Sequence, residues 1–523
     1  MIIPMDDGDS AEIASLLESG LFDPQWYAAT YPDVRMSGLS PGEHFLRIGR
    51  RIGRPGTDQA LQRQRSGSAA PLPESGSAAS RSQLPNAVGR APLPVITAQI
   101  REAVARTKLF DERWYLSQYG PRTRHPEDLL IDYLSSFTAD PTRDPGPLFS
   151  TAYYAATHQD IGGLHPFLHL VLHGLREGRH AFPAHKINSF FDGVDPSQVP
   201  EFRDVAAADR LTVVLTWDKG NFFFTEIAEY TARYLQTLGM RAESRTDVSA
   251  AELEKSNVII VAPHEFCVYG PGRDWSPRHL QRATYLNTEQ WHTSWFALAF
   301  GFVIQSGKVI DINPASAAAL ATLGFEASFM PLLPLAGSCF SHPDQPLSES
   351  LTRHKAMKSL HYPEAVHERP YDVMFVGVAN QRRAKALAGL APVLQRYECF
   401  VHAPEFATPV RAGDPDMIGN ADLAQIARNS KILLNIHQGE THYFEWHRLV
   451  VSGIMEGCIV VTEKCHPTGV FQPGEHYLET TLEDMGALIA HLLDTEHGRA
   501  TLARVHENCR KARNKIMESG TLS

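Results

Sequence analysis

The densest group of chemically capable side chains in this sequence lies between two apolar runs, at residues 432–436 and 458–462. An amide, a carboxylate, an imidazole and a permanent cation stand there close together: Gln438, Glu445, His447 and Arg448. Together these groups can bind a polar ligand that carries both hydroxyl groups and phosphate. Apolar runs of this length predict buried parallel strands, and open α/β sheets bind ligands at the carboxyl ends of such strands, beside helix N-termini.

A second polar loop follows the apolar run at residues 371–377 and carries Asn380, Arg382 and Arg383. Arginine side chains at the start of a helix can neutralise a diphosphate. Simpler interpretations stay open for these residues. The arginines can form surface ion pairs, the Glu445 carboxylate can stabilise a helix start through the helix dipole, and His447 can be a packing residue.

Acidic and basic groups also follow predicted strands earlier in the chain: Asp218, His264, Glu265 and Glu289. Each of them can take a proton from a hydroxyl group, and Asp218 and Glu265 are our first choices. The alternative is that each one is a cap or loop residue. Gly220 and Asn221 lie in the loop after the first strand, where backbone amides can approach a phosphate, but no glycine-rich phosphate-binding pattern accompanies them.

Strands and helices alternate around these groups. We predict strands at residues 211–217, 257–263, 283–289, 301–304, 326–330, 371–377, 398–402, 432–436 and 458–462. Helices are predicted at residues 222–238, 384–394 and 420–429, and one more has Glu445 in its first turn. This alternation predicts an α/β fold of parallel sheets with helices on both faces. We expect two doubly wound, Rossmann-like domains, at residues 201–337 and 371–523, joined by the polar segment 338–370.

Three related segments precede the α/β region and begin at Leu21, Leu109 and Leu148. Each carries an aromatic pair: Trp26 and Tyr27, Trp114 and Tyr115, Tyr153 and Tyr154. A unit this small buries little alone, so we expect the copies to pack together or on a neighbour. They predict a small α-helical module at residues 1–55 and 98–200, with a disordered Ser/Ala/Pro-rich linker at 56–97. The aromatic residues are expected to pack inside it; a platform for sugar or for a partner protein is the alternative.

Composition limits the classes of function. The chain has 523 residues, which suggests about three domains, and its net charge of −10 argues against nonspecific nucleic-acid binding. Six scattered cysteines without a C-x-x-C pair predict buried thiols rather than a metal site. Asp414 and Asp416 match the Asp-x-Asp of some metal-dependent enzymes, but their flanks predict a turn.

The N-terminal residues 1–14 have no basic region and no apolar core, so we expect no signal peptide. The most apolar uncharged stretch, residues 295–305, is about half the length that a membrane-spanning helix needs. We therefore expect a cytoplasmic protein, with peripheral binding at the inner membrane face as the alternative.

Two successive doubly wound units with a polar helix entry in the second resemble the two-domain glycosyltransferase architecture called GT-B. The order of several strings strengthens the resemblance. Four segments of this chain resemble strings of the GT-B donor domain: residues 375–383, 430–435, 453–463 and 471–475. Residues 285–290 resemble an acceptor-domain string of bacterial surface-polysaccharide members. The segment LFDPQWYAATYPDV resembles repeats that accompany bacterial polysaccharide glycosyltransferases.

The resemblance implies transfer of a sugar from a nucleotide-sugar donor to a bacterial cell-surface glycan, with no metal and no cofactor besides the nucleotide-sugar co-substrate. Donor binding would fall to Asn380, Arg382, Arg383, Gln438, Glu445, His447 and Arg448. The catalytic candidates would be Asp218, Glu265 and His264, and the acceptor-side loop would include Gly220, Asn221 and Glu289. The implied partners are the donor, a glycan or lipid-linked glycan acceptor, and a membrane surface or protein bound through the repeats, but no nucleic acid.

The sequence departs from the family at one position. Many retaining GT-B members carry two glutamates that flank seven residues in the donor site, and here the residue eight positions after Glu445 is Gly453. A catalytically degenerate scaffold or a glycan-binding subunit is therefore the alternative function. A GT-B-fold sugar-nucleotide epimerase is a third, although it would not need the N-terminal repeats.

Overall fold

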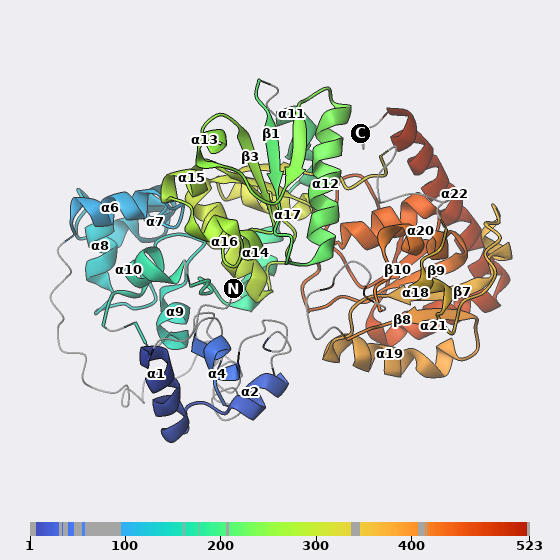
Figure 1. Cartoon of the computed structure of the whole chain (residues 1–523), viewed down its shortest axis with the longest axis horizontal. Helices are drawn as coiled ribbons and strands as arrows, with labels where there is room; N and C mark the ends of the chain where they lie inside the picture. Colours follow the sequence, from blue (N-terminus) through green and yellow to red (C-terminus); the bar gives the residue numbers. More distant parts are fainter. Residues whose placement is uncertain are drawn as a thin grey trace. The chain divides into compact units, whose positions relative to one another are not determined.

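In a computed structural model of the chain, the described residues are 7–30, 34, 40–46, 55–57 and 96–519, with short gaps at 159, 162, 176, 206–208, 336–345, 406–409, 411–413 and 415. The chain divides into two compact units. Figure 1 labels the helices and strands of the described residues. The first comprises Met1–Ala184 and Thr293–Gly307, and the second His185–His292 and Lys308–Ser523. The predicted linker lies mostly outside the described residues, as does Cys339, and the predicted domain boundaries stay predictions.

The first unit consists of short helices. They are α1 (Asp7–Glu18), α2 (Pro24–Thr30), α4 (Pro41–His44), α6 (Ala98–Ala105), α7 (Glu112–Tyr119), α8 (Leu129–Ser136), α9 (Thr151–Thr157), α10 (Pro166–His169) and α16 (Ser294–Ser306). None of the helices in the described parts of the chain is long and apolar enough to cross a membrane.

The three related segments share one hydrogen-bonding pattern. In each, the second aromatic residue is a buried tyrosine whose hydroxyl pairs with a polar side chain of the copy's second helix. The pairs are Tyr27 with His44 at 3.1 Å, Tyr115 with Asp132 at 2.8 Å, and Tyr154 with His169 at 3.0 Å. Each copy also closes with a backbone hydrogen bond: Asp23 N to Gly56 O, Asp111 N to Pro145 O, and Ser150 N to Ala181 O. The two histidines and Asp132 therefore hold the copies of the repeat together.

The predicted strand at residues 301–304 is wrong, because these residues lie inside α16. Thr293 caps the start of this helix, and Gly307 ends it with a φ of 75°. Residues 294–306 are apolar on nearly every side, so neither a two-residue nor a 3.6-residue period is visible in the sequence. Only the length of the apolar run distinguishes the two possibilities, since a run of this length favours a helix over a strand.

The second unit contains both sheets, and the predicted α/β class is confirmed. The first sheet is parallel, with the strand order β2-β1-β3-β4-β5-β6. Its strands are β1 (Thr212–Leu215), β2 (Ala242–Arg245), β3 (Asn257–Val261), β4 (Thr284–Asn287), β5 (Lys308–Asp311) and β6 (Glu326–Phe329). Strands β2 and β5 escaped prediction because charged residues interrupt them. The strand order reverses between β1 and β3, which leaves a crevice at their carboxyl ends.

The second sheet is also parallel, with the order β11-β10-β9-β7-β8. Its strands are β7 (Tyr371–Val376), β8 (Cys399–His402), β9 (Ser430–Asn435), β10 (Ile459–Thr462) and β11 (Leu478–Glu479). Here the order reverses between β7 and β9. The loops that follow these two strands are the two loops that the sequence singled out for donor binding.

The helices of the second unit connect these strands. They are α11 (Phe202–Val205), α12 (Phe222–Thr237), α13 (Ala250–Leu253), α14 (Pro263–Phe266), α15 (Pro277–Arg282), α17 (Pro314–Thr322), α18 (Glu349–Thr352), α19 (Gln381–Leu394), α20 (Asn420–Arg428), α21 (Leu482–Asp494) and α22 (Glu496–Ser519). Asn221 and Asn380 cap α12 and α19 through their side chains, so both helices begin where the sequence placed polar loops.

The helix after β9 differs from the prediction. It is a π-helix, η9 (His447–Gly453), followed by a 3₁₀ turn, η10 (Ile454–Glu456), and Gly457 ends it with a φ of 65°. Glu445 lies before it rather than in its first turn. The Glu445 carbonyl oxygen accepts hydrogen bonds from the N–H groups of Arg448 at 2.9 Å and Leu449 at 3.0 Å. The wider turn of a π-helix is frequent at functional sites.

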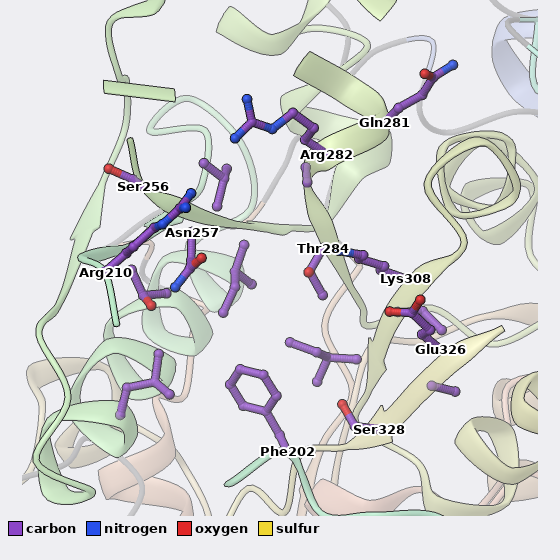
Figure 2. Close-up of a pocket in the computed structure, with 18 of the residues that line it drawn as sticks. Phe202, Arg210, Ser256, Asn257, Gln281, Arg282, Thr284, Lys308, Glu326 and Ser328 are labelled. Carbon is purple, nitrogen blue, oxygen red and sulfur yellow. The ribbon is translucent and has the colours of Figure 1, made fainter. Parts of the chain in front are cut away.

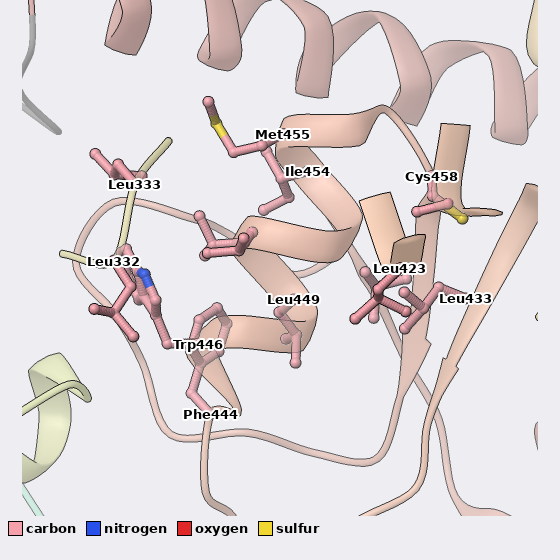
Figure 3. Packing of buried hydrophobic residues seen from close by; sticks show 14 of the residues in the cluster. Leu332, Leu333, Leu423, Leu433, Phe444, Trp446, Leu449, Ile454, Met455 and Cys458 are labelled. Atoms are coloured by element: carbon pink, nitrogen blue, oxygen red, sulfur yellow. The ribbon is translucent and has the colours of Figure 1, made fainter. Parts of the chain in front are cut away.

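One hydrophobic core extends across both sheets. Trp446 is 2% exposed, and its ring lies edge-to-face against Phe329 of β6 with a centroid distance of 4.7 Å. Figure 3 shows Trp446 beside Leu332 and Leu333, which follow β6, and Leu449 of η9. The segment that carries Glu445 and Arg448 is therefore anchored by apolar contacts from both sheets.

Replacing Trp446 by alanine should remove this anchor. We expect Trp446→Ala to lower the free energy of unfolding by about 3–5 kcal/mol, because a large ring leaves a closely packed core. Chemical denaturation measures the change. The matched control Met517→Ala removes a side chain that is 60% exposed, and should change the free energy by less than about 0.5 kcal/mol. An equally small loss for Trp446→Ala would contradict a shared core.

Candidate functional site

The two polar loops of the second sheet meet at one carboxylate. Glu445, which is 8% exposed, accepts from Arg383 Nη2 at 3.1 Å and pairs with Arg448 Nε at 3.1 Å. A third donor, Nε2 of Gln290, lies 3.3 Å from the same carboxylate and comes from the loop after β4. Three donors around a buried carboxylate hold it in one orientation.

Arg383 is enclosed by protein groups. It is 1% exposed, and its Nε donates to the carbonyl oxygen of Ile436 at 2.8 Å. A buried guanidinium needs acceptors on its nitrogen atoms, and the loop after β9 supplies them through Ile436 and Glu445. Arg383 therefore fixes that loop, and its predicted contact with a donor stays a prediction.

Asn380 and Arg382 are also engaged within the protein. Asn380 Oδ1 accepts from Arg383 N at 2.8 Å, and its Nδ2 donates to the carbonyl oxygen of Gln438 at 3.1 Å. Arg382 forms a two-pronged ion pair with Glu463, with Nη1 to Oε2 at 2.8 Å. The Gln438 side chain is exposed. For Arg382 the structure thus gives the ion-pair interpretation, and its binding to a diphosphate is untested.

Arg448 differs from Arg382 and Arg383 because it lines a cleft. Its side chain is 20% exposed, and its Nη1 donates to the carbonyl oxygen of Val376 at the end of β7. A Cβ on Gly377 would collide with this guanidinium, so the close approach requires glycine there. Burial lowers the pKa of Arg448 to about 10, and Glu445 opposes the shift, so the group stays cationic at neutral pH.

A cleft of about 240 Å³ lies beside Arg448, at the carboxyl ends of β7 and β8. Both sheets contribute to its walls, which include Phe223, Ile227, Ile312, Leu332, Val378, His402, Pro404, Met417, Ile418 and His447. Burial lowers the pKa of His447 to about 4, so this imidazole is neutral at pH 7. Asp416 also lines the cleft, which therefore combines apolar walls with one cation, Arg448, and one carboxylate.

The first sheet also holds the loop that carries Glu445. Asn313 Nδ2 donates to the carbonyl oxygen of Phe444 at 2.6 Å. Asp311, at the end of β5, accepts from Asn313 N at 2.8 Å and from Asn287 Nδ2 at 2.9 Å, which fixes the Asn313 loop. Burial raises the pKa of Asp311 to about 6.

Sequence reasoning missed two of these residues, Gln290 and Asn313. For Asn313 a signal existed, because Asn before Pro314 is a helix-start pattern at a strand end. Gln290 stands in the segment 285–290 that resembles an acceptor-domain string, but nothing local predicts its contact with Glu445, which lies 155 residues away.

Glu265 lies in α14, after β3, and its carboxylate reaches the loop that follows β1. Asn221 N donates to Glu265 Oε2 at 3.0 Å, and a Cβ on Gly220 would collide with this carboxylate. Ala262, just before α14, has a left-handed φ of 50°, a strained conformation that often occurs at functional sites. Burial raises the pKa of Glu265 to about 7. The Asn221 amide, predicted to approach a diphosphate, is thus occupied by Glu265.

The other predicted acid–base residues are less suited to proton transfer. Asp218 is exposed in the loop after β1. Burial lowers the pKa of His264 to about 3, and its Nε2 lies 3.7 Å from Glu289 Oε1. A general base works best with a pKa near the operating pH, which favours Glu265. No group of three His, Cys, Asp or Glu side chains that could hold a metal occurs among residues with described positions, and the metal-free expectation stays a prediction.

The raised pKa of Glu265 should appear in the stability of the protein. Because its proton is bound more tightly in the folded chain, its contribution is fully present below about pH 4.5 and is lost as the pH rises through about 7. We expect Glu265→Gln to raise the free energy of unfolding at pH 8 by up to roughly 3 kcal/mol, and to change it little at pH 4. Denaturation at both pH values measures this. Asp218→Asn is the exposed control, and an equal effect in both variants would contradict the account.

No family model matches the sequence, and no curated protein matches it. Solved structures do match. HepE of Anabaena, solved with UDP, is 10% identical with a TM-score of 0.33, and the match covers 59% of this chain and 99% of HepE. An α1,3-fucosyltransferase is 10% identical with a TM-score of 0.34, and the match covers 64% of this chain and 98% of that chain. A glycosyltransferase from Rickettsia africae is 8% identical with a TM-score of 0.34, and the match covers 60% of this chain and 95% of that chain. Likeness at this level concerns the fold alone.

Proposed function

We propose that the protein is a glycosyltransferase of GT-B type that uses a nucleotide-sugar donor. The single observation that carries the proposal is the partly exposed Arg448 beside a cleft at the switch point of the second sheet. A cation held there by Glu445 can neutralise the diphosphate of the leaving nucleotide. Of the strings that resemble a GT-B donor domain, the one at residues 375–383 borders this cleft through Val376, Gly377 and Val378.

The volume of the cleft fits one ring of the donor. Ligand pockets for drug-sized molecules usually measure about 300–1,000 Å³, and this cleft measures about 240 Å³. We assign it to the base or to the sugar ring, with the diphosphate passing Arg448. His447 and Arg448 would provide the polar contacts, and Glu445 would act as a positioning residue for Arg448 rather than through direct contact with hydroxyl groups.

The acceptor hydroxyl would lose its proton to Glu265. Its carboxylate is oriented by Asn221 N and lies near the carboxyl ends of β1 and β3. With a pKa of about 7, roughly half of these carboxylates are ready to accept a proton at neutral pH. Asp218 and His264 remain weaker candidates for the base. The Glu289 carboxylate lies beside the His264 imidazole.

The finer parts of the proposal rest on the sequence. The repeats that resemble those of bacterial polysaccharide glycosyltransferases support a cell-surface glycan, or a lipid-linked glycan, as the acceptor. They also support binding of the first unit to a protein or a membrane surface, and with it a cytoplasmic or peripheral location. The donor assay identifies the sugar and the nucleotide.

A second candidate is a scaffold or glycan-binding subunit without turnover. Two observations favour it: Gly453 stands where many retaining members have their second glutamate, and the Glu445 carboxylate already has three protein donors. Glycan binding without any nucleotide-sugar turnover would support this candidate.

The donor assay is a measurement of nucleotide release from UDP-, GDP-, dTDP- and CMP-sugars, with glycan acceptors and with or without EDTA. One donor should turn over and keep its rate in EDTA. We expect Arg448→Ala to lower kcat/KM by about a hundredfold, because a charge-assisted contact with the diphosphate is worth about 1.5–3 kcal/mol.

The matched control is Arg396→Ala, which removes an arginine that is 53% exposed and pairs with Asp494. This variant should keep the wild-type kcat/KM. An active protein whose Arg448→Ala variant is unimpaired would contradict the role of Arg448, and absence of turnover with every donor and acceptor would favour the scaffold.

The base is tested by the pH dependence of turnover. Because Glu265 must be unprotonated to act, kcat/KM should rise with pH and level off above about pH 7. Glu265→Gln should lower kcat by about 10²–10⁴-fold and abolish this rise. An unchanged pH profile in Glu265→Gln would exclude Glu265 as the base.

A further inference from the structure

A second and larger cavity lies at the opposite, amino-terminal edge of the first sheet. It measures about 710 Å³, within the usual range for ligand sites. The first residues of five parallel strands line it, and all five are polar: Thr212, Asn257, Thr284, Lys308 and Glu326. Figure 2 shows Asn257, Thr284, Lys308 and Glu326 around this cavity together with Arg210 and Arg282. The donor cleft borders strands of the other sheet, so the two are separate sites.

The lining of this amino-edge cavity is more cationic than the protein as a whole. Arg210, Arg282 and Lys308 line it, against one carboxylate, Glu326, whereas the chain carries a net charge of −10. Arg282 pairs with Glu254, and Arg210 lies 3.4 Å from Asp209. Lys308 stands opposite Glu326 in the register of β5 and β6, and within the described chain it has no ion pair. Lys308 is therefore the lining cation that an anionic ligand can pair with.

The floor of the cavity is formed by apolar side chains that are largely buried. Four that are each at most 9% exposed are Phe202, Leu235, Met240 and Phe325. Lys308, Glu326 and the amide and hydroxyl groups of Asn257 and Thr284 lie at less buried positions of the lining. These polar groups suit a ligand rich in hydroxyl groups.

We propose that the amino-edge cavity binds an anionic carbohydrate, through Lys308 and the two arginines for its phosphate or carboxylate and through the strand-start side chains for its hydroxyl groups. The binding does not depend on the proposed transferase activity. Resting on that proposed function, the natural ligand is a charged segment of the acceptor glycan, held away from the reacting end.

The test is isothermal titration of the full-length protein with glucose 6-phosphate, glucuronate, glucose and inorganic phosphate. At least one of the two anionic sugars should bind, and which one binds identifies the anionic group. Glucose and inorganic phosphate should bind at least about tenfold more weakly, because each lacks half of the recognised chemistry. Binding should weaken as salt is added.

Variants locate the binding. Lys308→Ala should lower the affinity for the anionic sugar by about tenfold or more. Lys255→Ala, an exposed lysine near Asn257 that does not line the cavity, and Arg448→Ala in the donor cleft should leave it unchanged. Failure of both anionic sugars to bind, equal binding of glucose, or binding that Lys308→Ala does not alter would each overturn the proposal. Turnover of a nucleotide-sugar in such a protein would show that the proposed function survives.

Discussion

The candidate site depends on the buried carboxylate of Glu445, between Arg383 and Arg448. Taking such charges out of water costs several kcal/mol for each ion, and the pairing repays this cost only when the geometry is good. The fold provides that geometry by placing β7 beside β9, so that the loops after both strands reach the same point. The carbonyl oxygens of Ile436 and Val376 then accept from the two guanidinium groups. Arg383 takes the fully buried position, whereas the Arg448 side chain is 20% exposed and lines the cleft.

The same carboxylate ties the two sheets together. Gln290 follows β4 and contacts Glu445 directly, and Asn313 follows β5 and holds the carbonyl oxygen of the preceding Phe444. Beneath these polar contacts, Trp446 packs against Phe329 of β6. The segment 444–446 is therefore fixed on three sides, by polar groups of the first sheet, by the arginines and by the shared core. The candidate site therefore needs both halves of the unit to be folded.

The sequence was informative where one local signal had one meaning. Apolar runs bounded by polar loops predicted most strands. Because the carboxyl ends of parallel strands meet at one edge of a sheet, the sequence also predicted that Asn380, Arg383, Glu445 and Arg448 lie close together. The prediction failed for residues 301–304, where a uniformly apolar helix has no visible period, and for β2 and β5, where charged residues interrupt the strands. It also failed for the π-helix, which differs from an α-helix in hydrogen bonding and not in composition. The pairing of Gln290 with Glu445 spans 155 residues, so only tertiary structure reveals it.

We propose that Glu445 acts by holding Arg448 against the diphosphate of the donor. A double-mutant cycle tests this role most directly, with the affinity for UDP or GDP measured by titration calorimetry in the wild type, Glu445→Gln, Arg448→Ala and the double variant. We expect both single variants to bind the nucleotide more weakly, and the double variant to lose no more affinity than Arg448→Ala alone. Losses that add in the double variant, or a Glu445→Gln variant that binds the nucleotide like the wild type, would contradict it.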